Sequence, residues 1–380
     1  ALAAIGTVAD LAPMTGESRA LVRMGLAELS ATPRAGLRAL LARACDDPAQ
    51  PTARDLGFGV APRVNAAGRI AEAELAIALL LEEDPTRAEE LADRLEAVNR
   101  ERRQLTASAV EAAQALIASD PALSVGDGPL ALRSDAWPLG ILGLVAGRLS
   151  DLLARPVAAA APVGGELRGS VRSTDDFHVA AALAECAAYL TKRGGHAAAG
   201  GFSVSAGEWD AFRAAFAALP RPFPVGGALV SANRLAVDLV LPAAHLGWQL
   251  ADEIARLAPF GPGHVEPLLA ITGLRVGEAR RVGSEGRHLL IRLRRGPEIF
   301  DAIAFGTPAE RPLPNAGDEL DVVATLERDA FQGIPRLRLR TLDYCHSAAS
   351  PLVDRRSMRR STVALAVGTR ATAATAGAAR

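Results

Sequence analysis

The stretch Thr86–Ser119 has the composition of one long helix. Its apolar residues recur at alternating three- and four-residue steps, which places them on one stripe of a helix. These residues are Leu91, Leu95, Val98, Leu105, Ala109, Ala112 and Leu116. Arg102 interrupts the stripe. At 1.5 Å of rise per residue the helix would span roughly 50 Å. This length favours a strut between two domains, and a self-associating coiled coil is the alternative.

The length of 380 residues allows two or three domains on either side of this helix. Hydrophobic residues make up 49% and charged residues 22%, so there is ample material for ordinary globular cores. The net charge is −1, which gives no global basic field. Any nucleic-acid site must therefore be a local cluster of arginines.

The cysteines Cys45, Cys186 and Cys345 are far apart and form no Cys-x-x-Cys pattern. Their spacing argues against a zinc site and a disulfide framework, and it fits a reducing cytoplasm. No apolar run has membrane-spanning length, and no signal peptide is visible. The chain opens on Ala1 rather than Met, in what we expect to be mid-strand, so we also expect the natural N-terminus to be missing.

The first stretch, Ala1–Val8, is an apolar run with β-branched residues, which is typical of a buried strand. Asp10 follows it. Ligands of open α/β sheets bind beyond the carboxyl ends of strands, so Asp10 is a candidate for metal or phosphate chemistry. The alternative is a carboxylate that ends a strand or caps a helix. Two helices, Ser18–Leu29 and Pro33–Arg43, come next.

The stretch Gly57–Arg69 contains Pro and Gly residues that predict a loop feeding a helix. Arg63 and Arg69 flank Asn65 there. Cations with an amide donor at a helix start can cradle an anion. A capped surface helix with two solvated arginines is the alternative.

A small α/β unit is expected after the long helix. Leu130–Leu132 and Pro156–Ala160 are predicted strands, with a helix at Gly140–Leu153 between them, and the helix Ala206–Ala218 closes the unit. Trp137 is a candidate for stacking on a base, and a position in the core or an interface is at least as well supported.

The most informative stretch of this unit, Leu167–Gly201, has two turns of small and cationic residues around a helical segment. Three glycines would let backbone amides approach a ligand without a Cβ in the way: Gly169, Gly194 and Gly195. Ser170 offers a hydroxyl, Arg172 a fork of donors, and His196 a donor whose charge changes near neutral pH. Two such loops facing each other would grip an oxyanion. Plain turns and solvated surface residues are the alternatives.

These residues also carry a resemblance. Gly-Ser-Val-Arg-Ser at 169–173 and Gly-Gly-His-Ala-Ala-Ala-Gly at 194–200 resemble the DHH-associated domain of the DHH phosphoesterase superfamily, and most closely that of the RecJ exonucleases. Gly-Thr-Val-Ala-Asp-Leu-Ala-Pro at 6–13 and Ala-Pro-Arg-Val-Asn-Ala-Ala-Gly-Arg at 61–69 resemble motifs of the same family. The segment 137–149 is similar to a further motif, with Pro138 where the common form has His.

The resemblance, which extends from Ala1 to about Tyr344, implies roles for several residues. Asp10 would be a ligand of a catalytic Mn²⁺ or Mg²⁺. The substrate backbone or its terminal phosphate would be bound by Arg63, Asn65, Arg69, Ser170, Arg172, Gly194, Gly195 and His196. The family's main catalytic domain, with its Asp-x-Asp and Asp-His-His motifs, would lie upstream, since no Asp-His-His occurs in this sequence.

From Ala228 onward, short β-like runs with Gly-rich turns predict a small closed barrel of the OB type. The runs are Leu268–Ile271, His288–Leu293, Ile299–Phe305, Glu319–Leu326 and Leu337–Leu342. Arginines are concentrated in its first half, namely Arg275, Arg280, Arg281, Arg287, Arg292, Arg294 and Arg295. They are candidates for tracking a single-stranded backbone, and a solvated β face is the alternative. Pro-Phe-Gly-Pro-Gly at 259–263 resembles a turn of the RecJ barrel, with His264-Val265 where the family commonly has Asn-Pro.

The expected fold is therefore a multidomain chain of α/β and β classes. Its parts are the end of a DHH-type α/β domain (1–85), a connecting helix (86–119), a DHH-associated α/β domain (120–225), an OB-fold barrel (226–345) and a disordered tail (346–380). A linker rich in Pro and Gly is expected at 223–227.

The resemblance implies a metal-dependent 5′→3′ exonuclease that hydrolyses single-stranded DNA in repair and recombination. Its partners would be single-stranded DNA, a single-strand-binding protein and a RecQ-type helicase, with no membrane, in the cytoplasm. One alternative is a fragment that binds single strands of nucleic acid without turnover. Another is a DHH-type enzyme that cleaves oligoribonucleotides or cyclic dinucleotides, which the barrel disfavours.

Overall fold

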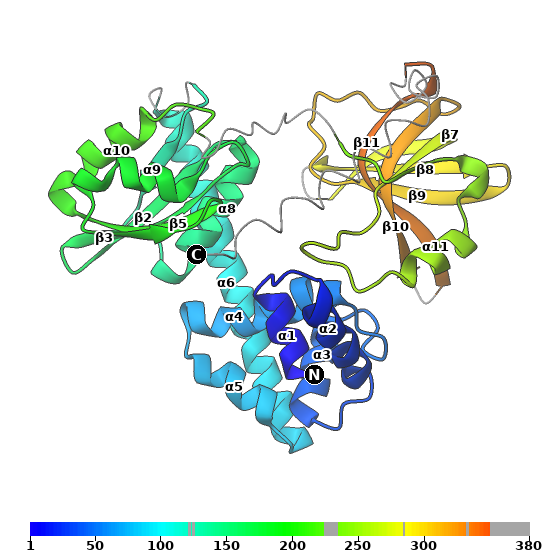
Figure 1. The fold of residues 1–380 in the computed structure, drawn as a ribbon, viewed down its shortest axis with the longest axis horizontal. Helices are drawn as coiled ribbons and strands as arrows, with labels where there is room; N and C mark the ends of the chain where they lie inside the picture. The colour runs from blue at the N-terminus through cyan, green and yellow to red at the C-terminus, as the bar shows by residue number, and fades with distance from the viewer. Residues whose placement is uncertain (121–122, 124–125, 224–234, 284–285, 332–333, 350–380) are drawn as a thin grey trace, which may run out of the picture. The chain divides into compact units, whose positions relative to one another are not determined.

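The computed structural model describes residues 1–120, 123, 126–223, 235–283, 286–331 and 334–349 (Figure 1). The chain divides into two compact units. The first contains residues 1–234 with 261–263, and the second contains 235–260 with 264–380. The expected linker at 223–227, except Phe223, and all but the first four residues of the expected tail at 346–380 lie outside the described residues.

The first part of unit one is a bundle of helices packed around one core of aliphatic and alanine side chains. The helices are α1 (Leu2–Ala9), α2 (Gly16–Leu29), α3 (Ala35–Ala44), a π-helix η1 (Asp55–Val60), α4 (Ala61–Ile70), α5 (Ala73–Leu81) and α6 (Pro85–Ser119). Each of them contributes at least one residue to this core.

The expected strand at Ala1–Val8 is wrong, because these residues form α1. Ala4 and Ile5 are buried, and Ala1 and Val8 pack against the same core, which is the spacing of one helix face. Alanine has the strongest intrinsic helix propensity, and it outweighs the three β-branched residues here. Asp10 is therefore the C-cap residue of a helix and does not follow a strand.

The loop expected within Gly57–Arg69 is also wrong. η1 runs directly into α4, so Arg63, Asn65 and Arg69 lie within a helix and not in a loop at its start. The proline Pro62 is compatible with this arrangement because it lies in the first turn of α4, where its missing N–H is not needed.

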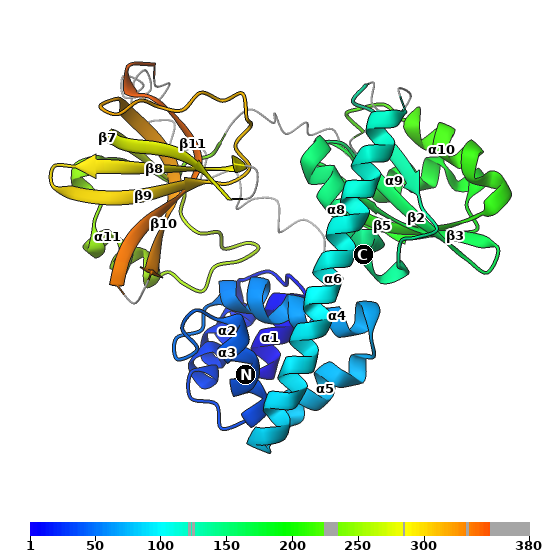
Figure 2. The same ribbon diagram turned by 180° about the vertical axis from the view of Figure 1, so that it is seen from behind.

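The long helix is confirmed as α6, which begins after Asp84, whose side chain accepts a hydrogen bond from the Arg87 N–H at 2.8 Å. Its first half packs against α3, α4 and α5, and its second half against α8 (Leu142–Leu153). Figures 1 and 2 show it running from the helical bundle to the sheet of the same unit. Leu91, Leu95 and Ala109 of the predicted stripe are buried within the chain, so the strut interpretation is confirmed. The last part of the stripe is wrong, because Ala112 and Leu116 are exposed and Ala113 and Ile117 are buried in their place.

The second part of unit one is a five-stranded sheet. Its strands are β1 (Leu130–Arg133), β2 (Val157–Val163), β3 (Glu166–Arg172), β4 (Lys192–Gly195) and β5 (Ala199–Ser205), in the order β1-β2-β3-β5-β4. β1 and β2 are parallel, and the other pairs are antiparallel. A 3-10 helix η2 (Leu139–Ile141) precedes α8.

Alternation along the strands separates two cores, one on each face of this sheet. Val157, Ala159 and Ala161 face α6 and α8. Ala158 and Ala160 face α9 (Val179–Glu185) and α10 (Trp209–Ala217). Trp137 is 5% exposed in the core on the α8 face, so its candidate role in stacking on a base is wrong.

Unit two is a β-barrel with one short helix. Its elements are β6 (Leu239–Pro242), α11 (Trp248–Ala255), β7 (Leu269–Val282), β8 (His288–Arg295), β9 (Glu298–Ala304), β10 (Glu319–Phe331) and β11 (Ile334–His346). The strand order is β10-β11-β9-β8-β7-β6, and a further pairing of β10 with β7 closes a ring of five strands. Inward-facing Leu, Ile, Val and Ala side chains fill the ring. This strand order is compatible with the expected OB-type barrel.

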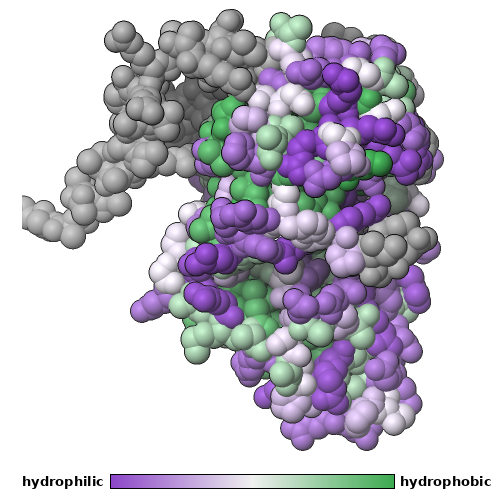
Figure 3. Space-filling model, turned by 90° about the vertical axis from the view of Figure 1, so that its right-hand side faces the viewer, coloured by the Kyte–Doolittle hydropathy of each residue, from purple (hydrophilic) through white to green (hydrophobic). Residues whose placement is uncertain are grey.

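Hydrophilic residues predominate on the face shown in Figure 3, with hydrophobic residues exposed in patches between them. Among the described residues, the helices are either too short or too polar to cross a lipid bilayer.

A single glycine sets how closely the helical bundle approaches the sheet part. A Cβ on Gly140, in η2, would lie 1.9 Å from the Arg69 carbonyl oxygen of α4. We expect Gly140→Ala to lower the free energy of unfolding by about 1–3 kcal/mol, because backbone must move. Urea denaturation measures this change.

The matched control is Gly147→Ala in α8, where the new Cβ would lie at an ordinary contact distance of 3.7 Å from Arg172 Cγ. We expect this substitution to be neutral or to stabilise by up to about 1 kcal/mol, since alanine favours a helix over glycine. Equal losses from both substitutions would contradict the packing account.

Candidate nucleic-acid interface

Ser170 and Arg172 lie two residues apart on β3, so their side chains share one face of the sheet. In the β2–β3 register, Ser170 is paired with Ala159 and Arg172 with Val157, which both face α8. The Arg172 Nη1 donates to Ser170 Oγ at 2.9 Å and to the Val171 carbonyl oxygen at 2.8 Å. The strand therefore presents a hydroxyl and a guanidinium as one group.

The N-terminal part of α8 makes room for this pair. A Cβ on Gly143 would lie 2.8 Å from Arg172 Nη2 and 3.2 Å from Ser170 Oγ. The missing side chain at Gly143 allows close packing, and the group that packs there is the Arg172 side chain. Arg172 is consequently half-buried between helix and sheet.

Arg69 of α4 joins this group from the helical bundle. Its Nη1 donates to the Gly140 carbonyl oxygen at 2.9 Å. Burial, followed by repulsion from Arg69, holds the pKa of the Arg172 guanidinium below its ordinary value. In the part of the chain that the structure describes, neither arginine forms an ion pair with a carboxylate. Two like charges without a counter-charge favour an anionic ligand. Asn65 is exposed one helical turn before Arg69.

The Gly194-Gly195-His196 segment lies two strands away on the same sheet. Gly194 is paired with Gly201, and Gly201 with Ser170, so the three form one row across β4, β5 and β3. With neighbouring strands about 4.8 Å apart, the row spans roughly 10 Å. His196 is exposed in the β4–β5 turn, and its N–H donates to the Ala199 carbonyl oxygen at 2.8 Å.

The glycines have different reasons for being small. Gly169 is in a strand and not in a turn, and a Cβ there would lie 2.1 Å from the Phe202 ring. The missing side chain therefore makes room for Phe202 and not for a ligand. Gly195 has φ +149° and lies close to the backbone of Ala199 and Gly200. Gly194 alone faces open space among these three. The two segments that were expected to be facing loops therefore lie on strands of one sheet and in the β4–β5 turn.

Arg63 is engaged within the protein. Its Nε lies 2.6 Å from Glu96 Oε2 of α6, and its Nη1 donates to the Gly59 carbonyl oxygen at 2.9 Å. Both charged side chains are largely shielded, with exposed fractions of 16% and 17%. Such a pair is structural, because it satisfies both charges as they leave water.

Asp10 does not by itself fit a hydrolytic metal centre. It is exposed at the end of α1. Among the described residues, no three His, Cys, Asp or Glu side chains come close enough to hold a metal ion. Phosphodiester hydrolysis by two cations needs several ligands that converge. We therefore derive no catalytic step from Asp10.

In the barrel, most of the seven arginines are used within the protein. Arg281 donates to the carbonyl oxygens of residues 307, 308, 309 and 311, and Arg295 to those of 243 and 244. Arg292 pairs with Glu278 at 3.2 Å, and Arg280 lies 3.7 Å from the same residue. These contacts favour a structural role for these four.

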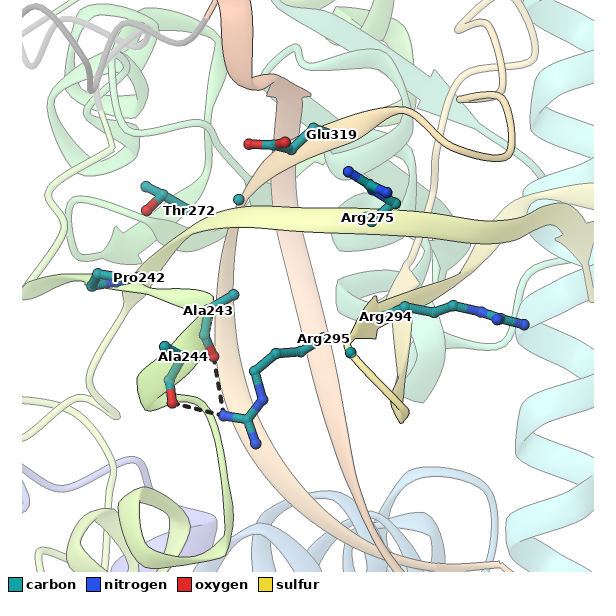
Figure 4. A pocket seen from close by; sticks show the side chains of 10 residues that line it. Pro242, Ala243, Ala244, Thr272, Arg275, Arg294, Arg295 and Glu319 are labelled. Atoms are coloured by element: carbon teal, nitrogen blue, oxygen red, sulfur yellow. Dashed lines mark hydrogen bonds between the residues drawn. The ribbon is translucent and has the colours of Figure 1, made fainter.

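Arg275 and Arg294 are two of the exposed arginines of the barrel. Arg275 and Arg294 are directly paired across β7 and β8, and neither forms an ion pair or hydrogen bond within the described residues. They line a pocket of ≈ 690 Å³ together with Thr272 and Glu319. In Figure 4, Arg295 turns to the carbonyls of the β6–α11 connection, whereas Arg294 extends away from them.

Unit one presents Arg69 and Arg172 without carboxylate partners among the described residues, and unit two presents an exposed pair of arginines on a β-barrel. Two family models match the chain: the DHHA1 domain over residues 126–219 and the RecJ OB domain over residues 237–343. The single-stranded-DNA-specific exonuclease RecJ of Dickeya dadantii is 33% identical over 342 residues, which cover 87% of this chain and 58% of that protein. The protein of the same name from Thermus thermophilus is 36% identical over 340 residues, which cover 87% of this chain and 46% of that protein.

Solved structures agree with these matches. The crystal structure of RecJ from Thermus thermophilus in complex with Mg²⁺ superposes with a TM-score of 0.72 at 32% identity, over 90% of this chain and 51% of that one. The chain belongs to the RecJ family. It spans about half the length of the relatives that it matches.

The ion pair of Arg63 gives a direct prediction. We expect Arg63→Gln to lower the free energy of unfolding by about 1–3 kcal/mol, because Glu96 is left shielded and without its closest partner. Arg100→Gln is the control. Arg100 is exposed on α6, the helix that carries Glu96, and its substitution should change the free energy of unfolding by no more than about 0.5 kcal/mol. Thermal and urea unfolding of both variants measure the difference, and a neutral Arg63→Gln would refute the structural role.

Proposed function

We propose that this chain anchors the 5′ end of a single DNA strand for 5′→3′ exonucleolytic hydrolysis in DNA repair and recombination. The observation that carries the proposal is the half-buried Arg172 guanidinium, hydrogen-bonded to Ser170 and facing Arg69, with no carboxylate partner within the described residues. A terminal phosphate carries up to two negative charges and accepts hydrogen bonds through several oxygens, which suits this arrangement.

Residues around this pair would extend the contact along the strand. Asn65 and Arg69 lie on one face of α4, since they are four residues apart. Gly194, Gly195 and His196 lie on the exposed side of the strand row. These residues would contact the phosphates nearest the 5′ end of the strand. Arg63 is not assigned to this contact, because it pairs with Glu96.

The barrel would bind the strand further along. Arg275 and Arg294 are exposed at the pocket shown in Figure 4, and OB folds bind single strands through basic grooves. Both grips act on phosphates, which carry no sequence information, so we propose that the chain binds without sequence preference.

Hydrolysis would depend on Mg²⁺ or Mn²⁺, the ions present in the Thermus RecJ complexes. Because the described residues bring no metal-ligand cluster together, we assign to this chain the binding and orientation of the strand, and no bond-breaking step. A single-strand-binding protein and a RecQ-type helicase stay predictions from the family resemblance, as does a cytoplasmic location.

The test is the affinity for a 5′-phosphorylated single strand relative to the same strand with a 5′-hydroxyl. We expect Arg172→Gln to reduce this preference about tenfold to a hundredfold, because a charge-assisted hydrogen bond contributes about 1.5–3 kcal/mol. Fluorescence anisotropy at fixed salt measures both affinities.

Arg213→Gln on α10 is the matched control, since it removes the same charge from the opposite face of the sheet. It should leave the preference unchanged. An Arg172→Gln variant that keeps the wild-type preference would show that the end of the strand is bound elsewhere.

The second candidate function is binding of single strands without turnover. The absence of a metal-ligand cluster among the described residues favours it. Incubation of the 380-residue chain with labelled single strands and Mn²⁺ separates the two functions. Metal-dependent release of nucleotides would exclude binding without turnover.

A further inference from the structure

Arg102 lies near the middle of α6, where its charge interrupts the apolar stripe. The side chain is half-buried, and its Nη2 donates to Asn99 Oδ1 at 2.9 Å. Asn99 is itself 3% exposed. The Arg102 Nε is shielded from water and has no hydrogen-bond partner within the described residues. A buried donor without an acceptor destabilises the folded state, so we expect a ligand to supply the acceptor here.

The electrostatics connect Arg102 to the site already described. Burial first, and then repulsion from Arg69 and Arg103, hold the pKa of Arg102 below its ordinary value. Arg69 also acts on Arg172 in the same direction. The positive charge of Arg69 thus acts on both of the other guanidinium groups.

No described carboxylate offsets these three charges. Glu101 precedes Arg102 on α6 and is exposed, and the two form no ion pair among the described residues. Glu96 of the same helix pairs with Arg63 at 2.6 Å and with Arg103 at 3.4 Å. Neither of these contacts involves Arg102. The protein therefore gathers three positive charges and places the local negative charge elsewhere.

The three arginines come from elements that pack together. α4 contacts both α6 and η2, and α6 contacts α8. Arg69 and Arg102 belong to the helical bundle, whereas Arg172 belongs to the sheet. An anion bound by all three would therefore bridge the two parts of unit one.

We propose that Arg69, Arg102 and Arg172 form one oxyanion site, in which a terminal phosphate supplies the counter-charge and ties the helical bundle to the sheet. This inference rests on the proposed function and adds a residue of the connecting helix to the end-binding site. It also accounts for a preference for strand ends. A terminal phosphate carries up to two charges, whereas an internal phosphodiester carries one, so three guanidinium groups favour the terminal group.

The first measurement uses inorganic phosphate as the probe. Phosphate should raise the melting temperature of the 380-residue chain above that in chloride at equal ionic strength, because it binds only the folded state. Arg102→Gln should lose most of this rise. Without phosphate, the variant should melt at or above the wild-type temperature, since a like charge has been removed. A structural arginine would instead lower it.

The second measurement uses single strands that carry a 5′-phosphate or a 5′-hydroxyl. Arg102→Gln should reduce the ratio of the two affinities about tenfold or more. The matched control is Arg100→Gln, two residues earlier on α6, where the arginine is exposed and is not among the charges that act on Arg102. It should leave both the ratio and the phosphate-dependent rise in melting temperature unchanged.

Comparison with Arg172→Gln separates the inference from the proposed function. If Arg172→Gln loses the 5′-phosphate preference and Arg102→Gln keeps it, the inference is overturned and the proposed function stands. If the wild-type chain shows no preference, the proposed function fails, and the phosphate-dependent melting temperature alone decides whether the three arginines bind an anion. Arg102→Gln that melts lower and retains the phosphate-dependent rise overturns the inference.

Discussion

Arg69, Arg102 and Arg172 carry positive charges without a carboxylate partner among the described residues, and the charge of Arg69 acts on both of the other two guanidinium groups. Like charges that leave water without a counter-charge destabilise a fold. Here they are held by packing on both sides of the sheet, with one core against α6 and α8 and another against α9 and α10. Gly140 and Gly143 let the backbones and the Arg172 side chain approach closely enough to keep the charges together.

Other arginines of the same unit show that the chain can neutralise a buried cation where it needs to. Arg63 is paired with Glu96, and Arg221 lies 2.9 Å from Asp176. Burial alone would raise the pKa of Asp176, but hydrogen bonds from Arg221 and Thr174 outweigh it and lower that pKa. The contrast with Arg69, Arg102 and Arg172 supports a ligand-binding role for the unpaired group. In the barrel, the same contrast separates Arg281 and Arg295 from the exposed Arg275 and Arg294.

Much of this fold could be predicted from the sequence, because its signals are periodic and local. The apolar stripe predicted α6, and short alternating runs predicted the barrel strands. The strand predicted at Ala1–Val8 was wrong because an alanine-rich run with three β-branched residues fits both a strand and a helix, and only its packing against the bundle decides.

The details of the site were harder to predict, because they depend on residues far apart in the chain. Glu96 engages Arg63 from 33 residues away, and the Phe202 ring, not a ligand, requires Gly169 to be small. Arg102 stood out only as an interruption of a stripe, since no local pattern links it to Arg69 or Arg172. The pairing of Ser170 with Gly201 and of Gly201 with Gly194 likewise follows from strand order, which spacing alone does not give.

The most direct measurement is a crystal structure of the chain with a short 5′-phosphorylated single strand. The account predicts oxygens of the terminal phosphate at about 2.7–3.2 Å from guanidinium nitrogens of both Arg102 and Arg172. A terminal phosphate bound on the barrel, or one that contacts neither arginine, would contradict it.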